Sequence, residues 1–146
     1  MSATAFVVTP ETRPRALSVL GEQLTVLAPA SRTEGYEIFL QQGDVGQGPP
    51  PHSHGWDESF YVISGEIEFG YGDKAMLAKP GTLVHLPAGT THWFRFAAKG
   101  EMVSMTSREG ASAFFTDVDA KVPHGAQPDI EKLGAVAAAH GLRIGA

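Results

Sequence analysis

The sequence predicts an all-β fold, a sandwich or barrel of short strands with one or two short helices near its C-terminal end. Short apolar runs recur along the chain, and 17 Gly and 10 Pro residues separate them. This pattern is typical of many short strands joined by turns. The length of 146 residues suits one hydrophobic core, so we expect a single domain over residues 1–146.

The first expected strands are residues 16–20 and 23–28, which flank Gly21-Glu22 as a hairpin. Residues 36–41 form the next strand, and a segment rich in Gly and Pro at 43–51 interrupts the pattern. Later apolar runs predict strands at residues 60–63, 67–71, 75–78, 83–86, 92–96 and 102–106.

Two helices are expected, at residues 112–118 and 128–139. Pro128 suits the first helical position, and Asp129 and Glu131 suit the positive end of the helix dipole. Ile130, Leu133 and Val136 follow at helical spacing, which we interpret as a packing surface rather than a binding site.

Composition excludes several classes of function. The net charge of −5 and the scattered Lys and Arg residues argue against a nucleic-acid partner. No apolar run approaches the roughly 18 residues of a membrane span. The first residues lack a secretory pattern, so we expect a cytoplasmic protein. With no Cys, any metal ligands must be His, Asp or Glu, and four of the six His residues lie between positions 52 and 92.

Ser64-Gly65 is interpreted as a two-residue hairpin turn. It would place Val62 opposite Ile67, Phe60 opposite Phe69, and Glu58 opposite Tyr71, all on one inward face. An acid such as Glu58 on an apolar interior face requires a partner, a hydrogen bond or a metal ion.

A second hairpin is expected at Ala88-Gly89, and it would set His85 directly opposite His92. Leu83, Phe94 and Phe96 would then share the inward face with these imidazoles. The opposite face would carry Val84, Leu86 and Trp93, which either the N-terminal strands or a second copy of the chain must cover. We expect a homodimer with Trp93 buried between the subunits.

His52-Ser53-His54 places two imidazoles on one face of an extended strand, with Glu58 in the same phase. Imidazole and carboxylate ligands suit Zn, Fe, Ni, Cu or Mn. The spacing resembles the two motifs of the cupin superfamily. The first motif is G-x5-H-x-H-x3-E-x6-G, matched by Gly46, His52, His54, Glu58 and Gly65. The second is G-x5-P-x-G-x2-H-x3-N, matched by Gly81, Pro87, Gly89 and His92, with Phe96 in place of the final Asn.

The resemblance implies a jelly-roll sandwich that holds one divalent ion through His52, His54, Glu58 and His92, with Zn as the favoured metal. His85 is either a further ligand or a buried, hydrogen-bonded His. If His85 takes the place of Glu58 at the ion, Glu58 becomes a partner of the ligands or a base. A metal-free cupin with a hydrogen-bonded His cluster is the alternative.

The expected cavity has apolar and aromatic walls, which suit a flat aromatic or polyketone substrate. No Lys or Arg is predicted on these walls. This argues against the sugar-phosphate isomerase cupins, which need a cation for the phosphate. The walls would be formed by Phe60, Val62, Phe69, Tyr71, Leu83, Phe94 and Phe96.

The stretch from Asp57 to Val62, and the His140-Gly141-Leu142 that follows the last helix, are similar to small actinobacterial cupins. The similarity is to quercetinases and to aromatic polyketide cyclases of the resistomycin-pathway type. It implies a cyclase in antibiotic biosynthesis in which the ion polarises a ketone and a metal-bound water or Glu58 removes a proton, with Tyr71 orienting a carbonyl. A quercetinase-like dioxygenase and a non-catalytic ligand-binding cupin are the alternatives.

Overall fold

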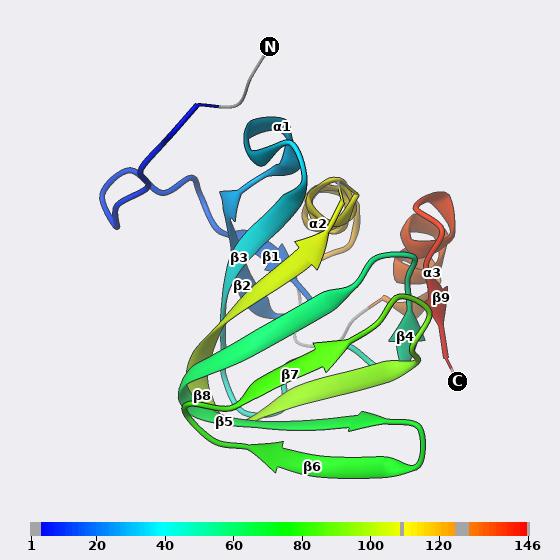
Figure 1. Cartoon of the computed structure of the whole chain (residues 1–146). Helices are drawn as coiled ribbons and strands as arrows, with labels where there is room; N and C mark the ends of the chain where they lie inside the picture. The colour runs from blue at the N-terminus through cyan, green and yellow to red at the C-terminus, as the bar shows by residue number, and fades with distance from the viewer. Residues whose placement is uncertain (1–3, 109, 125–128, 146) are drawn as a thin grey trace.

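The computed structural model describes residues 4–108, 110–124 and 129–145. Within these ranges the chain has nine strands and three short helices (Figure 1), and the expected all-β fold is confirmed. In chain order they are β1 (Leu17–Val19), β2 (Glu22–Ala28), α1 (Ala30–Thr33), β3 (Tyr36–Gly43), β4 (His52–Ser53), β5 (Glu58–Tyr71), β6 (Lys74–Ala78), β7 (Leu83–Leu86), β8 (His92–Ser107), α2 (Ala111–Lys121), α3 (Ile130–Ala139) and β9 (Arg143–Ile144).

The strands form a curled antiparallel sheet in which β8 is the central element. The sheet runs β1-β2-β3-β8-β4-β9, and β5 pairs with β8 on one side and with β6 and β7 on the other. The long strands β5 and β8 pair over almost their whole length, from Glu58 opposite Thr106 to Tyr71 opposite His92. This curl gives the sheet a concave inner face, toward which the candidate ligands point.

The predicted hairpin at Ser64-Gly65 is wrong, because β5 continues through this position as one bent strand. Gly65 has a φ of +74°, and a Cβ added there would lie 2.5 Å from the carbonyl oxygen of Lys99 on β8. The left-handed conformation and the close approach of a second backbone both require glycine. The turn lies later, between Tyr71 and Lys74. The predicted inward faces hold all the same, because the irregular pairing between Val62 and Ile67 shifts the alternation along β5 by one residue.

The predicted pairing of β7 with β8 is also wrong, because β7 pairs with β5. Ser59 lies opposite His85 and Phe60 lies opposite Val84. Val84 and Leu86 therefore point into the core, where both are buried, while Leu83 is 64% exposed. The faces of β7 are the reverse of those expected, and Val84 and Leu86 cannot form an intersubunit surface.

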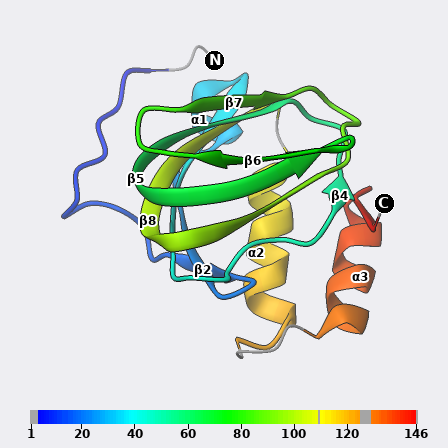
Figure 2. The same cartoon turned by 90° about the horizontal axis from the view of Figure 1, so that it is seen from below.

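The helices close one side of the curled sheet, as Figure 2 shows for α2 and α3. Phe114 and Val118 of α2 and Leu133 of α3 pack on Leu24 and Phe39 of the sheet. Both predicted C-terminal helices are present, although Pro128 lies outside the described residues. Asp129 caps α3 by accepting a hydrogen bond from the Lys132 amide. No helix in the described ranges has the length and apolar character to cross a bilayer.

Candidate metal centre

Three imidazoles converge at one end of the inner face. The rigid Pro49-Pro50-Pro51 run leads into β4, which carries His52, and His54 follows directly after the strand; both side chains are buried. His92, the first residue of β8, lies directly opposite His52. One ring nitrogen from each of the three residues lies within 4.8 Å of the other two. The sequence motif thus brings together the three His residues that it predicts.

Each imidazole is oriented by a backbone carbonyl. The Nδ1 atoms of His52, His54 and His92 lie 2.8, 3.0 and 2.8 Å from the carbonyl oxygens of Pro50, Trp56 and Thr90. A carbonyl oxygen can only accept, so Nδ1 carries the hydrogen in all three rings. In the neutral ring the Nε2 atom is left with a lone pair. Second contacts of this kind fix the tautomer of metal-binding histidines.

Glu58 at the start of β5 completes the cluster. Its Oε1 atom lies 3.3 Å from Nε2 of His54, and its Oε2 atom lies 3.8 Å from Nε2 of His92. Among the described residues, Nε2 of His54 and Nε2 of His92 are buried without a hydrogen-bond partner, so the 3.3 Å approach lacks hydrogen-bond geometry. Glu58 therefore lies beside two of the three imidazoles.

The electrostatics favour neutral imidazoles at His52 and His92 and an ionised carboxyl at Glu58. Burial, with the neighbouring His92, lowers the pKa of His52 to about 4. Burial also lowers the pKa of His92. For Glu58, burial acts to raise the pKa, but the interaction with His54 and the nearby His92 and His52 outweigh it and lower the pKa. Neutral imidazole and ionised carboxylate are the states that coordinate metals.

This donor set fits a divalent cation. Three ring nitrogens lie within 4.8 Å of one another and a carboxylate lies beside two of them, and a lone pair or a carboxylate oxygen cannot donate a hydrogen bond. Metal–nitrogen bonds of about 2.0–2.1 Å place the ligand atoms around one ion about 3–4 Å apart. The ring nitrogens lie within 4.8 Å of one another, so small side-chain rotations would bring them to this spacing. Buried acceptors without donors are costly, and a cation removes that cost. In a metal-free cluster held by hydrogen bonds, these ring nitrogens would have hydrogen-bond donors as partners, whereas Nε2 of His54 and of His92 have none among the described residues.

His85 does not join the cluster. It lies on the outer face of β7, is exposed, and its Nδ1 atom is 2.8 Å from the hydroxyl of Ser59. The predicted position of His85 opposite His92 is wrong because His92 begins a strand that pairs with β4 and β5 instead.

The predicted cavity walls are corrected by the structure. Phe60, Val62, Phe69 and Phe96 pack against one another in a second core, and Leu83 is exposed. A small cavity of about 50 Å³ lies instead between the cluster and the helices, with His52, His54 and Glu58 in its lining. Its other walls are largely apolar and include Leu24, Pro49, Trp56, Phe94, Phe114, Leu133 and Leu142.

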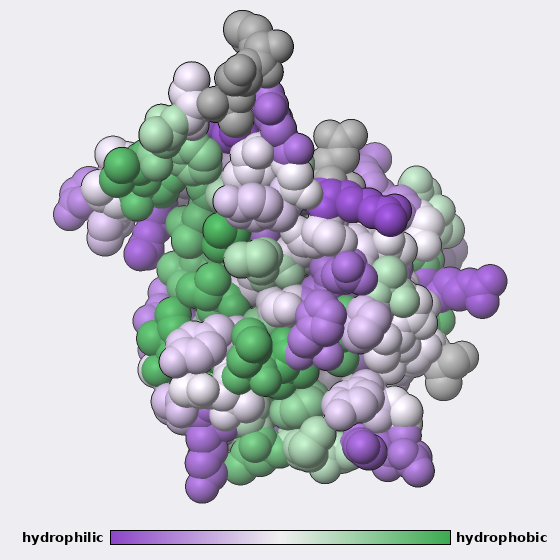
Figure 3. Space-filling view, viewed as in Figure 1, coloured by the Kyte–Doolittle hydropathy of each residue, from purple (hydrophilic) through white to green (hydrophobic). Residues whose placement is uncertain are grey.

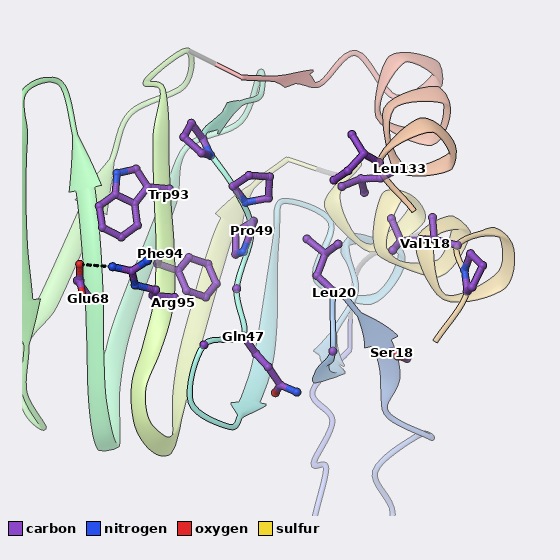
Figure 4. Close-up of a pocket in the computed structure, with 18 residues that line it drawn as sticks. Ser18, Leu20, Gln47, Pro49, Glu68, Trp93, Phe94, Arg95, Val118 and Leu133 are labelled. Atoms are coloured by element: carbon purple, nitrogen blue, oxygen red, sulfur yellow. Dashed lines mark hydrogen bonds and ion pairs between the residues drawn. The ribbon is translucent and has the colours of Figure 1, made fainter. Parts of the chain in front are cut away.

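A wider groove of about 580 Å³ adjoins the small cavity, and the two share Leu20, Pro49, Pro50, Phe94 and Leu133. Figure 4 shows Trp93 and Arg95 on one side of this groove and Leu133 of α3 on the other. Arg95 is paired with Glu68 at 2.8 Å. Trp93 thus lies in the groove lining. Tyr71 lies opposite His92 in the register, its ring stacked on Phe69.

The motif analysis missed two features of the cavity. Trp56 stacks on His54, with ring centroids 4.5 Å apart and planes 12° apart. Glu22 is buried in the lining of the small cavity and accepts a hydrogen bond from Gln41. The sequence does carry a signal for Glu22, since it lies in phase with Leu24 on an alternating strand.

The curled antiparallel sheet with three buried imidazoles and a carboxylate on its inner face defines a β-barrel protein with a candidate metal site. A family model described as Cupin domain matches residues 35–107, half of the 146 residues. The chain belongs to this family, and the resemblance seen in the two motifs is confirmed.

Several solved structures are similar in fold. KdgF from Halomonas sp. is 20% identical, with a TM-score of 0.67 over 75% of this chain and 99% of that one. The polyketide cyclase RemF from Streptomyces resistomycificus is 15% identical, with a TM-score of 0.61 over 71% of this chain and 80% of that one. The ectoine synthase from P. lautus is 18% identical, with a TM-score of 0.58 over 68% of this chain and 74% of that one. No curated protein matches the chain. At these identities the likeness shows the fold alone.

Proposed function

We propose that the chain is a metal-dependent enzyme that cyclises a poly-β-ketone substrate to an aromatic product by aldol chemistry. The observation that carries this proposal is the set of three clustered imidazoles with Glu58 beside them, at the edge of an apolar cavity. A fold shared with the polyketide cyclase RemF supports the choice of substrate class.

His52, His54 and His92 would hold the ion, with Glu58 as the fourth ligand or as a base beside it. Such an ion supplies polarisation of a ketone oxygen. Within the chain, Glu58 is the carboxylate placed to accept a proton from the carbon next to that ketone. Tyr71 would orient a second carbonyl from its position opposite His92. The apolar walls would fold the chain of the substrate and exclude water.

The groove supports a substrate longer than the inner cavity. The linings of the groove and the cavity share five residues, so the two adjoin, and an extended ketone would lie along the groove with its reacting end toward the cluster. The small cavity has no Lys or Arg among its described lining residues. This absence disfavours a phosphorylated substrate, which would need a cation to bind it.

The test begins with elemental analysis of the protein as purified, for which we expect one equivalent of Zn. The loaded protein is then incubated with diacetylacetone, a linear triketone that becomes orcinol and water by one aldol closure and dehydration. We expect orcinol to form faster than in buffer, and not with His54→Ala. Oxygen uptake with a flavonol and no cyclisation would instead favour the dioxygenase. A metal-free protein would favour ligand binding without catalysis.

The homodimer expected from the sequence remains a proposal, with its interface moved to another face. Tyr61, Leu83 and Met105 are exposed apolar side chains on β5, β7 and β8. In the register they are close neighbours, because Tyr61 lies opposite Leu83 and Ser59 lies opposite Met105. Figure 3 shows apolar side chains gathered on this side of the molecule. Clustered apolar surface of this kind usually marks an interface, and two-fold dimers are the commonest assemblies.

A further inference from the structure

The small cavity contains a second carboxyl group, Glu22, at the start of β2. Glu22 is 2% exposed and lies in the same cavity lining as His52, His54 and Glu58. Acids are rarely buried without a partner, so a second one in an otherwise apolar cavity needs an explanation. The proposed metal chemistry does not use this group.

A hydrogen-bonded chain across three strands holds Glu22 in place. The hydroxyl of Ser104 on β8 donates to Oε1 of Gln41 on β3 at 2.6 Å. The amide of Gln41 then donates to Oε1 of Glu22 at 3.0 Å. Because Oε1 of Gln41 accepts from Ser104, its NH₂ group must face Glu22. The side chain of Glu22 makes no other hydrogen bond with the described residues, which leaves its second oxygen for a ligand.

The surroundings favour the protonated form of this carboxyl. Burial raises the pKa of Glu22 to about 8, with Gln41 acting in the opposite direction and the carboxylate of Glu58 adding to the rise. The titratable groups that line the same cavity are His52 from β4, His54 just after it, and Glu58 from β5. The helices contribute only apolar side chains to it, Phe114, Phe115 and Leu133. Because Oε1 of Glu22 accepts from Gln41, the hydrogen of the protonated form belongs on the other oxygen, Oε2.

We propose that Glu22 is a catalytic acid of this cavity, a role that rests on the proposed cyclisation. It donates a hydrogen bond to the ketone oxygen of the substrate that is attacked. As the new carbon–carbon bond forms, the electron pair of the carbonyl double bond moves onto that oxygen, which takes the proton from Glu22. The proton lost by the attacking carbon goes to Glu58. Water then carries one proton from Glu58 back to Glu22, so that both carboxyls return to their starting states.

Three variants test this role in the metal-loaded protein. Glu22→Gln keeps a hydrogen-bond donor of the same shape but cannot release a proton. Glu22→Leu removes both functions. Glu101→Gln is the matched control, because Glu101 also pairs with a glutamine, Gln42 at 3.3 Å, but does not line the cavity. Each variant is measured for bound metal, for the Kd of diacetylacetone and for the rate of orcinol formation.

We expect Glu22→Gln to keep its metal and to bind diacetylacetone within about threefold of the wild type. Its rate should fall by about 100-fold or more, the usual contribution of a positioned acid. Glu22→Leu should show the same loss of rate together with about tenfold weaker binding. Glu101→Gln should match the wild type in all three measurements. The wild-type rate should also fall above pH about 8, and the rate of Glu22→Gln should lack this decline.

Several outcomes overturn the proposal. A wild-type rate in Glu22→Gln shows that Glu22 gives no proton, and loss of metal in that variant shows that it is a ligand. If the wild type binds diacetylacetone without converting it, the proposed cyclisation fails by itself. In that case the affinity for diacetylacetone tests the proposed hydrogen bond from Glu22 to a ketone oxygen. Equal affinities of Glu22→Leu and the wild type overturn this hydrogen bond, whereas tenfold weaker binding by Glu22→Leu supports it. A wild type that neither binds nor converts the triketone overturns both proposals.

Discussion

Replacing Glu22 by Gln should change how the stability of the protein depends on pH. An unfolded chain releases the Glu22 proton near pH 4.5, whereas the folded protein keeps it to about pH 8 because the carboxyl is buried. Below the lower value both states are protonated and the group has no effect. As the pH rises, only the unfolded state releases its proton, so the wild type becomes less stable until about pH 8.

The size of this effect follows from the interval between the two pKa values. At about 1.4 kcal/mol for each pH unit, the wild type should lose about 5 kcal/mol of unfolding free energy between pH 4.5 and pH 8. Glu22→Gln has no proton to release and should lack this loss. Its stability relative to the wild type should therefore rise by about 5 kcal/mol across the interval, a large part of the total stability of a small domain.

Urea unfolding of both proteins from pH 5 to pH 9, at the same metal loading, measures this difference directly. Comparing the two proteins cancels the titration of the other carboxyls and histidines. Glu101→Gln again provides the control. Its unfolding free energy relative to the wild type should not change between pH 5 and pH 9. A Glu22→Gln difference that varies by less than about 1 kcal/mol over the range would refute the reasoning, because it would mean that water reaches the carboxyl.

Further changes have equally specific expected outcomes. His54→Ala or His92→Ala should lose the bound metal in elemental analysis, while His85→Ala, on the outer face, should keep it. Gly65→Ala should lower the unfolding free energy by about 2 kcal/mol or more, since its Cβ would meet the Lys99 carbonyl oxygen at 2.5 Å; wild-type stability contradicts this. Leu83→Glu should convert the dimer to monomer in light scattering, whereas a native monomer disproves the dimer. Removing the metal with a chelator should lower Tm, because the ion binds only the folded state.

The sequence predicted the strands better than their partners. Alternation within each half of β5 is local and places Phe60 and Val62 on one face. The irregular pairing between Val62 and Ile67 shifts its phase, so that Phe69 also points inward. The pairing of β5 and β8 joins residues far apart in the chain, from Glu58 with Thr106 to Tyr71 with His92. A glycine at the end of an apolar run is equally compatible with a turn and with a bend in a continuous strand. At Gly65 the backbone of β8, at Lys99 and Gly100, lies against the glycine, and this contact cannot be read from the sequence.

The candidate site was predictable where its ligands lie close together in sequence. His52 and His54 are two residues apart at the end of one short extended segment, and the second motif adds His92. Glu22 and Gln41 come from separate strands, and their pairing depends on how β2 and β3 are aligned. The prediction for His85 failed for a related reason, since one wrong strand partner reverses which face a side chain occupies.

The strand that carries His52 has only two residues, and its neighbours come from distant parts of the chain. β4 lies between His92 at the start of β8 and Ile144 in β9. The amide of Gly145 also donates to the carbonyl oxygen of Pro51 at 2.6 Å. During synthesis, His52 therefore gains its β9 partner, Ile144, only after about ninety further residues have been made. Metal binding should accordingly come late in the synthesis of the chain. A reporter protein fused directly after β9 should disturb the pairing of β9 with β4, and with it the position of His52.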